Sequence, residues 1–329
     1  MTRLTVAVTI ITRNRLESLR YCLACVAQQT HPPNEIIVVD SSTDSATGDF
    51  VKKHYPGACY VHTTAPLGSQ PRLRNLALQC AKSDIIAATD DDGYPQPGWL
   101  EAILKSYGPG VGAVGGRILQ GDADEGKAGL RPNAGTITLT GGARADFNAV
   151  WSEPFEVDHL QGTNMSFRRD LLNQAGGWDL TLESGYAAYE DTETCLRIKR
   201  LGYKVIYTPH AVVQHGLEAR QGGFTRDFGK SVPLAYSVSR NAVYTMLRSY
   251  RLVPRVIVGG AILAPIANAA RILLPVKSGG SGRSLAISPT RLRAVAAIIT
   301  GHLAGLVWVF RRRKENPWPR LNSDGRIEV

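Results

Sequence analysis

Short apolar runs alternate with amphipathic segments over the first ninety residues of the chain. The apolar runs are rich in Val and Ile, which is typical of buried parallel strands, and they are Leu4–Ile11, Glu35–Asp40, Cys59–Thr63 and Asp84–Thr89. The segments between them carry apolar residues at helical spacing and predict helices at Leu16–Gln29, Asp49–Tyr55 and Pro71–Ala81. Strands that alternate with helices in this order predict an α/β fold with a doubly wound, mostly parallel sheet.

The alternation is less regular between residues 111 and 215. The pattern predicts strands at Val111–Ile118, Gly162–Arg168, Lys204–Tyr207 and His210–His215. It predicts helices at Arg169–Ala175 and Glu190–Leu201, the second opened by acidic residues and closed by Gly202. The stretch Gly121–Ala145 is rich in Gly, Asp, Ala and Arg, and we expect it to be a mobile insertion.

The residues after Gly222 have a different character. They predict one helix at Leu234–Arg251, followed by apolar stretches at Val256–Ala270 and Ala294–Phe310. A membrane-spanning helix needs about 20 apolar residues, and both stretches are shorter than that. We therefore expect these helices to lie on a membrane or to dip into one leaflet.

Charge divides the chain at nearly the same place. Residues 1–220 carry 21 Lys and Arg against 24 Asp and Glu, whereas residues 221–329 carry 17 against 4. This split predicts a catalytic body at residues 1–221 and a basic, helical C-terminal region at residues 222–329 that associates with a membrane. A basic region attracts lipid head groups or nucleic acid, and the interleaved apolar stretches favour lipid and argue against nucleic acid.

The basic run Arg311–Lys314 follows the last apolar stretch directly, which the positive-inside rule places on the cytoplasmic face of the cell membrane. The alternative is that these helices pack on the catalytic body or on a second subunit. The first residues read as a strand and not as a signal peptide. The five cysteines are an odd number, which argues against a disulfide framework, so we expect free thiols and a reducing compartment.

Three carboxylates, Asp90, Asp91 and Asp92, follow the fourth predicted strand at once. Like charges this close repel one another, and a divalent cation with a preference for oxygen ligands, Mg²⁺ or Mn²⁺, would relieve the repulsion. A solvated acidic turn is the alternative. Asp40 ends the second predicted strand, and ligands of such sheets bind beyond the carboxyl ends of the strands.

A second group of candidates lies further along the chain. Glu190 and Asp191 begin a predicted helix, where they suit either a general base and its neighbour or a plain helix cap. His215 ends a predicted strand and is a candidate metal ligand. Trp178 and Asp179 are candidates for contact with an acceptor, although Trp178 also suits a core. Arg74, on the helix before the acidic strand, could reach phosphates.

These pieces together resemble the family 2 glycosyltransferases, which have the GT-A fold. The resemblance runs from about Val6 to His215 and rests on the order and spacing of VTIITRNRLESLRYCL, QQTHPPNEIIVVDSSTD, RLRNLALQCAKSDIIAATDDDGYPQPGWL, GTNMSFRRDLL, AGGWD and YEDTETCLRIKRLGYKVIYTP. It implies an inverting transfer of a sugar from a nucleotide diphosphate sugar, most readily UDP or dTDP, to a lipid-linked or polysaccharide acceptor.

The resemblance also implies roles for the matching positions. Thr12 and Arg13 would line the nucleotide pocket and Asp40 would contact the base. Asp90 and Asp92 would form the D-x-D element that holds Mg²⁺ or Mn²⁺, with Asp90 also near the ribose of the nucleotide sugar, and His215 would complete the metal site. Asp191 would be the catalytic base, with Glu190 beside it.

One position departs from the family pattern. Residues Ile11–Asn14 contain Arg13, whereas members commonly have Pro-Thr-Tyr-Asn at this place, and the identity of the nucleobase is therefore left open. Two other functions remain as alternatives. A nucleotidyltransferase that makes nucleotide sugars would have a Gly-rich phosphate loop after the first strand, which residues 12–16 lack. A catalytically degenerate nucleotide-binding membrane protein would have lost its acidic residues, but the Asp90–Asp92 triplet and the pair Glu190 and Asp191 are both present.

Overall fold

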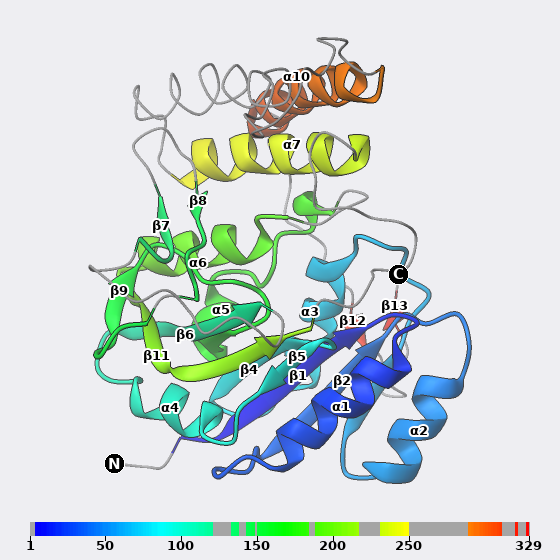
Figure 1. Ribbon diagram of the computed structural model, residues 1–329, viewed down its shortest axis with the longest axis vertical. Helices are drawn as coiled ribbons and strands as arrows, with labels where there is room; N and C mark the ends of the chain where they lie inside the picture. Colours follow the sequence, from blue (N-terminus) through cyan, green and yellow to red (C-terminus); the bar gives the residue numbers. More distant parts are fainter. Residues whose placement is uncertain are drawn as a thin grey trace, which may run out of the picture.

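The computed structural model describes residues 4–120, 133–137, 143–148, 150–183, 188–216, 231–249, 289–310, 320–321 and 327–328. A mixed sheet runs through the main body with helices on both faces, and a pair of long helices covers one end (Figure 1). The sheet has nine strands, in the order β3-β2-β1-β4-β10-β6-β11-β5, with β9 paired to β11.

The first half of the sheet is parallel. It contains β1 (Val6–Thr12), β2 (Glu35–Asp40), β3 (Cys59–His62) and β4 (Ile85–Asp90), connected by α1 (Leu16–Ala27), α2 (Ala46–His54) and α3 (Gln70–Cys80). The register places Thr12 opposite Asp40 and Ile11 opposite Asp90. The carboxyl ends of three strands therefore meet at one edge, as the strand and helix pattern predicts.

The second half mixes directions. Strand β10 (Met165–Arg168) is antiparallel to both β4 and β6 (Val111–Gln120), so β6 runs the same way as β4. Strand β11 (Lys204–His215) is parallel to β6, and the short strands β5 (Gly93–Pro95) and β9 (Phe155–Val157) are antiparallel to β11.

The remaining elements are short. The helices are α4 (Trp99–Lys105), α5 (Arg169–Gln174), the 3₁₀ turn η1 (Leu180–Leu182) and α6 (Glu190–Arg200). Two separate antiparallel pairs are β7 (Thr136–Ile137) with β8 (Ala143–Arg144), and β12 (Arg320–Leu321) with β13 (Ile327–Glu328).

Two sequence expectations need comment. Lys204–Tyr207 and His210–His215 were expected to be separate strands, but they form the single strand β11, whose register to β6 shifts between Thr208 and Val212. Pro209 has no N–H, so a bulge here lets the strand continue without a ladder bond from that residue. In the expected insertion Gly121–Ala145, the described residues 133–137 and 143–145 include β7 and β8; the rest, like Val256–Ala270, lies outside the described residues.

The core has two layers because strand side chains alternate between the faces of the sheet. In β1, Val6, Val8 and Ile10 pack with apolar residues of α1 and α4, whereas Ala7 and Ile11 pack with those of α3 on the other face. Full burial of one such side chain contributes about 1.5–3 kcal/mol. Apolar packing on both faces fixes the register of the strands and hence the residues at their ends.

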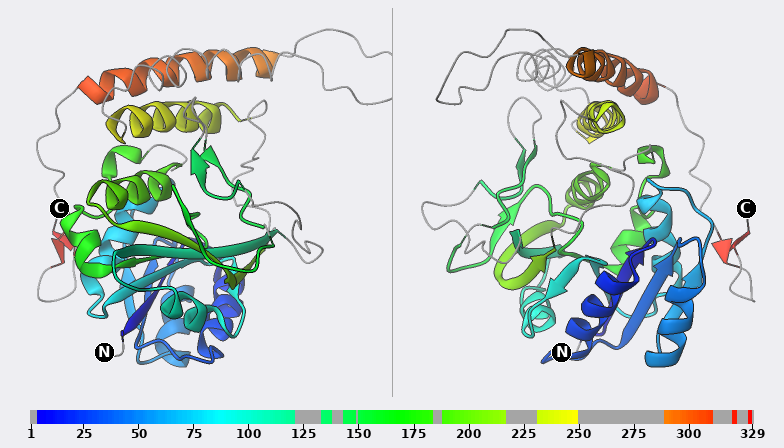
Figure 2. Two further views of the ribbon diagram at one scale, coloured as in Figure 1. Left: turned by 90° about the vertical axis from the view of Figure 1, so that its left-hand side faces the viewer. Right: turned by 45° about the vertical axis from the view of Figure 1, so that its right-hand side comes forward.

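The helix pair is formed by α7 (Val232–Ser249) and α10 (Pro289–Phe310). Helix α7 lies between α10 and the body in both directions of view (Figures 1 and 2). The two helices cross closely at glycines: a Cβ on Gly301 would lie 2.5 Å from Tyr236 O, and one on Gly305 would lie 2.6 Å from Arg240 O. Within the part of the chain that the structure describes, no helix is both long enough and apolar enough to cross a bilayer.

Candidate active site

A cavity of about 700 Å³ opens at the carboxyl edge of the sheet. It is bordered by the ends of β1, β4 and β11 and by the start of α6. The structure brings most of the residues predicted from the sequence to this one cavity, namely Thr12, Arg13, Arg74, Asp90, Asp92, Glu190, Asp191 and His215.

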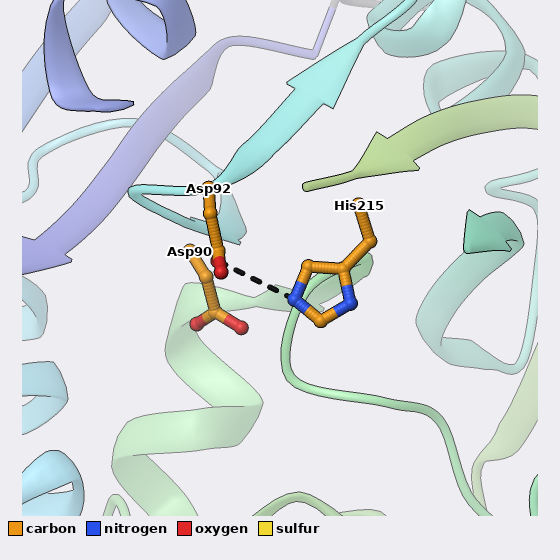
Figure 3. A group of neighbouring side chains, drawn as sticks. All are labelled: Asp90, Asp92 and His215. Carbon is orange, nitrogen blue, oxygen red and sulfur yellow. Dashed lines mark ion pairs between the residues drawn. The ribbon is translucent and has the colours of Figure 1, made fainter. Parts of the chain in front are cut away.

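Asp90, Asp92 and His215 converge in this cavity (Figure 3). Each offers one potential ligand atom, and these atoms all lie within 4.8 Å of one another. Strand pairing explains why His215 arrives here, because β11 places it opposite Gly93, the residue after Asp92. The N–H of Gly216 also donates to Asp92 O at 2.7 Å.

The state of His215 fits a metal ligand. The ring is 2 % exposed, and within the part of the chain that the structure describes neither of its nitrogens makes a hydrogen bond. Nε2 lies only 3.3 Å from Asp92 Oδ1, a contact of opposite charges if the ring is protonated. Buried polar atoms normally find partners, so an orphaned imidazole beside two carboxylates indicates room for a cation. Two carboxylates suit Mg²⁺ or Mn²⁺, and the imidazole adds a ligand that Mg²⁺ seldom takes.

Arg15 neutralises part of the acidic cluster. Its Nη1 lies 2.7 Å from Asp91 Oδ1 and its Nη2 lies 2.7 Å from Asp92 Oδ2. Thr12 Oγ1 donates to Asp91 Oδ2 at 2.8 Å. Burial raises the pKa of Asp91 to about 7 in spite of these partners. Burial also disfavours the ionised form of Asp92, but His215 and Arg15 outweigh it and hold that pKa below its usual range.

Asp90 is fixed by two partners on opposite sides. Arg74, itself 3 % exposed, brings Nη2 to 3.1 Å from Asp90 Oδ1, and Thr163 Oγ1 donates to Oδ2 at 2.7 Å. Arg13 acts differently, because its Nη1 donates to the carbonyl oxygens of Ser41 and Ala65, at 2.6 and 3.0 Å, and so ties two loops at the edge of the cavity.

Sequence reasoning missed Arg15 and Thr163. Both carry a signal that could have found them: Arg15 follows β1 at the same edge of the sheet as Asp90, and Thr163 lies in the GTN segment that precedes β10.

The pair Glu190 and Asp191 begins α6 after Tyr189, which has a left-handed φ of 68°. Asp191 Oδ2 accepts from the N–H of Gly162 at 3.0 Å, and its Oδ1 accepts from the N–H of Thr192 at 2.6 Å. Glu190 is 8 % exposed, and burial, reinforced by the charge of Asp191, raises its pKa to about 8. Glu190 is therefore mainly neutral at pH 7, while Asp191 is the member of the pair that faces polar donors.

Asp40 does not line the cavity. It is fully buried, its Oδ1 accepts from the N–H of Ser42 at 2.7 Å, and its Oδ2 accepts from the hydroxyl of Tyr60 at 2.7 Å. Its neighbour Ser41 lines the cavity instead. The structure thus places Asp40 as a support of the loop after β2.

Trp178 and Asp179, expected to contact an acceptor, also lie away from the cavity. Trp178 is fully buried edge-on against Phe167, with ring centroids 5.9 Å apart. Asp179 caps η1 by accepting from the N–H of Thr181 at 2.8 Å, and it accepts from the hydroxyl of Tyr244 at 2.6 Å and from Arg248. The AGGWD segment therefore serves the core and the contact with α7.

Comparison with solved structures agrees with this architecture. The chain is similar to a mannosyltransferase from Pyrobaculum calidifontis, solved in complex with GDP-Man and Mn²⁺, with a TM-score of 0.56 and 21 % identity over 95 % of this chain and 89 % of that one. At this identity the likeness describes the fold, and it confirms the predicted GT-A class.

Residues 7–176 match the glycosyl transferase family 2, and the chain belongs to this family. It is 26 % identical to the glucosyl-dolichyl phosphate glucuronosyltransferase of Haloferax volcanii, over 65 % of this chain and 69 % of that protein. It is 28 % identical to the pre-mycofactocin glycosyltransferase of Mycobacterium tuberculosis, over 79 % of this chain and 51 % of that protein. The chain thus spans about two thirds of one relative and about half of the other.

Proposed function

We propose that this glycosyltransferase moves a sugar from a nucleotide diphosphate sugar to an acceptor hydroxyl with inversion of the anomeric centre. The observation that carries the proposal is that two adjacent residues hydrogen-bond to two different carboxylates, Asp191 and Asp90. Gly162 donates to Asp191, and Thr163 donates to Asp90. The candidate base and the candidate cation site are thereby held on two sides of one cavity, where a donor and an acceptor can meet.

Asp191 is the proposed general base. Its carboxylate would take the proton of the acceptor hydroxyl as that oxygen attacks the anomeric carbon. The bond from the anomeric carbon to the diphosphate oxygen breaks in the same step, and the nucleoside diphosphate leaves. A single displacement of this kind inverts the centre. Glu190, with its pKa raised to about 8, stays neutral at pH 7 and does not compete for the proton.

Asp90, Asp92 and His215 are the proposed ligands of a divalent cation, Mn²⁺ or Mg²⁺. When bound, such a cation supplies electrostatic stabilisation of the negative charge on the departing diphosphate. The chain's own cations contribute on the same side of the cavity. Arg15 and Arg74 already lie against Asp92 and Asp90, where a guanidinium can exchange a carboxylate for a phosphate oxygen. Thr12 and Arg13 line the cavity where the nucleotide is expected.

The proposed acceptor is a lipid-linked saccharide. Two considerations support it: the Haloferax volcanii relative is named for a dolichyl phosphate substrate, and α10 carries a surface suited to a membrane. A polysaccharide acceptor is the alternative. The names of the relatives do not identify the nucleobase of the donor, so the nucleotides to be compared by calorimetry are UDP, dTDP and GDP.

The outer face of α10 carries an exposed apolar stripe. Leu292, Ile299, Leu303 and Val307 recur at helical spacing and are 54, 49, 58 and 50 % exposed. Arg293 is exposed at the start of the helix, and the sequence continues after its end with Arg311–Lys314. An apolar stripe flanked by basic residues is typical of helices that lie in the interface of anionic membranes. We therefore infer peripheral association with the cytoplasmic face of the cell membrane and no role for nucleic acid.

Sedimentation with vesicles tests this surface. The double variant I299E/L303E places two carboxylates on the stripe and is expected to abolish co-sedimentation with vesicles of phosphatidylglycerol and phosphatidylethanolamine at low salt. The matched control T300E/A296E changes polar or small exposed positions of the same helix. Equal sedimentation of wild type and I299E/L303E would reject α10 as the membrane surface.

Calorimetric titration with UDP, dTDP and GDP, each with and without Mn²⁺, tests the donor site. We expect one nucleotide to bind in a Mn²⁺-dependent manner to the wild type and to lose this binding in Asp92→Ala. No binding of any nucleotide would contradict the proposed donor site and with it the enzyme function.

A further inference from the structure

Helix α7 presents a buried polar side chain to the segment that leads into the catalytic pair. Asn241 is 0 % exposed, and its Nδ2 donates to two main-chain carbonyls, Leu182 O at 3.0 Å and Ala188 O at 2.8 Å. Its Oδ1 accepts from Arg240 Nε at 2.9 Å. One amide group therefore joins the residue that ends η1 to the residue just before Tyr189.

Arg240 extends the same contact. Its Nη2 donates to Thr181 O and, at 3.2 Å, to Glu183 O. The side chain of Glu183 is held from the other side by Arg72 of α3, whose Nη2 lies 3.1 Å from Glu183 Oε2. The first part of the segment is thus fixed by several independent bonds. Ala188, which lies just before Tyr189, accepts its bond from Asn241.

The residue after Ala188 needs such support. Tyr189 adopts φ 68°, a left-handed conformation that is unfavourable for a residue other than glycine. Strained backbone persists where the surrounding structure holds it in place. Glu190 and Asp191 follow directly, so the direction in which the Asp191 side chain enters the cavity depends on the turn at Tyr189.

We propose that Asn241 is a positioning residue for Asp191, acting through its bond to Ala188 O and the left-handed turn at Tyr189. This inference rests on the proposed role of Asp191 as base. Asn241 is not among the residues that line the cavity, and its side-chain hydrogen bonds join Leu182, Ala188 and Arg240, whereas the ends of β1 and β4 form the donor side of the cavity. Loss of its two donated bonds should therefore slow the chemical step and leave nucleotide binding intact.

The chain offers a matched control one helical turn further on. Thr245 is also 0 % exposed on α7, and its Oγ1 has no hydrogen-bond partner among the described residues. Thr245→Val keeps the shape of the side chain and removes no bond, whereas Asn241→Leu keeps approximate volume and removes both donated bonds. Asn241→Asp serves as a second variant, because it keeps the shape of Asn and also lacks the N–H donors.

The experiment compares the full-length wild type, Asn241→Leu, Asn241→Asp and Thr245→Val. The substrate is UDP-glucose, dTDP-glucose or GDP-mannose, according to the base that calorimetry selects, with hydrolysis of the donor as the reaction. We expect the Asn241 variants to lose about 10- to 100-fold in kcat, with the KM and the Mn²⁺-dependent nucleotide Kd within about two-fold of wild type. Thr245→Val should match the wild type in all three.

Amide hydrogen exchange gives a readout that needs no turnover. Faster exchange at residues 188–194 in an Asn241 variant, and not in Thr245→Val, is expected. Unchanged exchange there, or a kcat equal to that of wild type, would overturn the positioning role. A wild type that neither binds nucleotide nor hydrolyses any of the three donors would instead refute the proposed function, and the exchange measurement would still decide the contact.

Discussion

The N–H of Gly162 donates a 3.0 Å hydrogen bond to Asp191 Oδ2, across 29 residues of sequence. The next residue, Thr163, donates to Asp90. Two carboxylates from different elements, one at the end of β4 and one at the start of α6, are therefore spaced by two consecutive residues. Small changes in this link should affect the distance between the two halves of the cavity more than they affect the fold.

Gly162→Ala is predicted to impair catalysis because the added methyl group would displace the end of the Arg74 side chain. A Cβ at this position would lie 2.8 Å from Arg74 Nη2 and 3.8 Å from Glu190 Oε1. Displacement of Arg74 also disturbs Asp90, so we expect kcat/KM to fall by about 10- to 100-fold. Gly98→Ala is the control, since a Cβ there meets nothing within 4 Å. Equal kcat/KM for the two variants would show that the link tolerates displacement.

Glu190→Gln is predicted to keep most of the activity at pH 7. The pKa of Glu190 is raised from 4.5 to about 8, chiefly by burial, so the amide mimics the protonated form that predominates at neutral pH. Ionisation of Glu190 adds a charge next to Asp191, and wild-type kcat should change as the pH rises through 8 while the variant lacks this step. Rate profiles between pH 6 and about 9.5 test the assignment. A variant that is inactive at pH 7 would give Glu190 a more direct role.

The same residue should shape the pH dependence of stability. A raised pKa in the folded state means that folding disfavours the carboxylate. The contribution of Glu190 to the free energy of unfolding is therefore complete below pH 4.5 and is lost as the pH rises towards about 8. Over this window the expected slope is about 1.4 kcal/mol per pH unit for the one proton involved. Glu190→Gln should remove this component, which urea unfolding of both proteins at several pH values can measure.

His215→Ala is predicted to weaken Mn²⁺ binding about ten-fold or more, because it removes one member of the Asp90, Asp92 and His215 group. The relaxation rate of water protons in a Mn²⁺ titration, or calorimetry with Mn²⁺ and no nucleotide, gives the affinity directly. His210→Ala is a suitable comparison: His210 is exposed at the bulge of β11 and contacts Ser152 O at 3.1 Å. An unchanged Mn²⁺ affinity in His215→Ala would remove His215 from the ligand set.

Gly301→Leu is predicted to destabilise the α7–α10 contact. The new Cβ would lie 2.5 Å from Tyr236 O, and forced overpacking of this kind costs about 1–3 kcal/mol. Ala296→Leu, at an exposed position of the same helix, should leave stability nearly unchanged. Thermal melts of both variants decide the point; similar melting temperatures would mean that α10 does not depend on this crossing.

The sequence predicted the parts of the fold that depend on local pattern. The four apolar runs became β1 to β4, and strand ends carried Thr12, Asp90 and Asp92 to the cavity because parallel strands end at a common edge. Periodicity could not show that His210–His215 continues the preceding strand, since the bulge after Thr208 is set by pairing with β6.

The direction of side chains was the feature that the sequence pattern could not predict. Asp40 ends a strand at the right edge, yet its oxygens bind Ser42 and Tyr60 beneath the loop. Trp178 and Asp179 were candidates for contact with an acceptor, with a core position as the alternative for Trp178, and partners distant in sequence, Phe167 and Tyr244, pack against them. Contacts of this kind depend on the assembled tertiary structure and leave no periodic trace in the sequence.

The contacts of Asp179 have a consequence for cutting or recombining this enzyme. The carboxylate is 5 % exposed and takes its partners Tyr244 and Arg248 from α7, so a fragment that stops where the charge of the chain changes would keep the acid and lose both partners. The interchangeable module is then the catalytic body together with α7. Chimeras that exchange the region after α7 between relatives should be joined after residue 249, so that each catalytic body keeps its own α7.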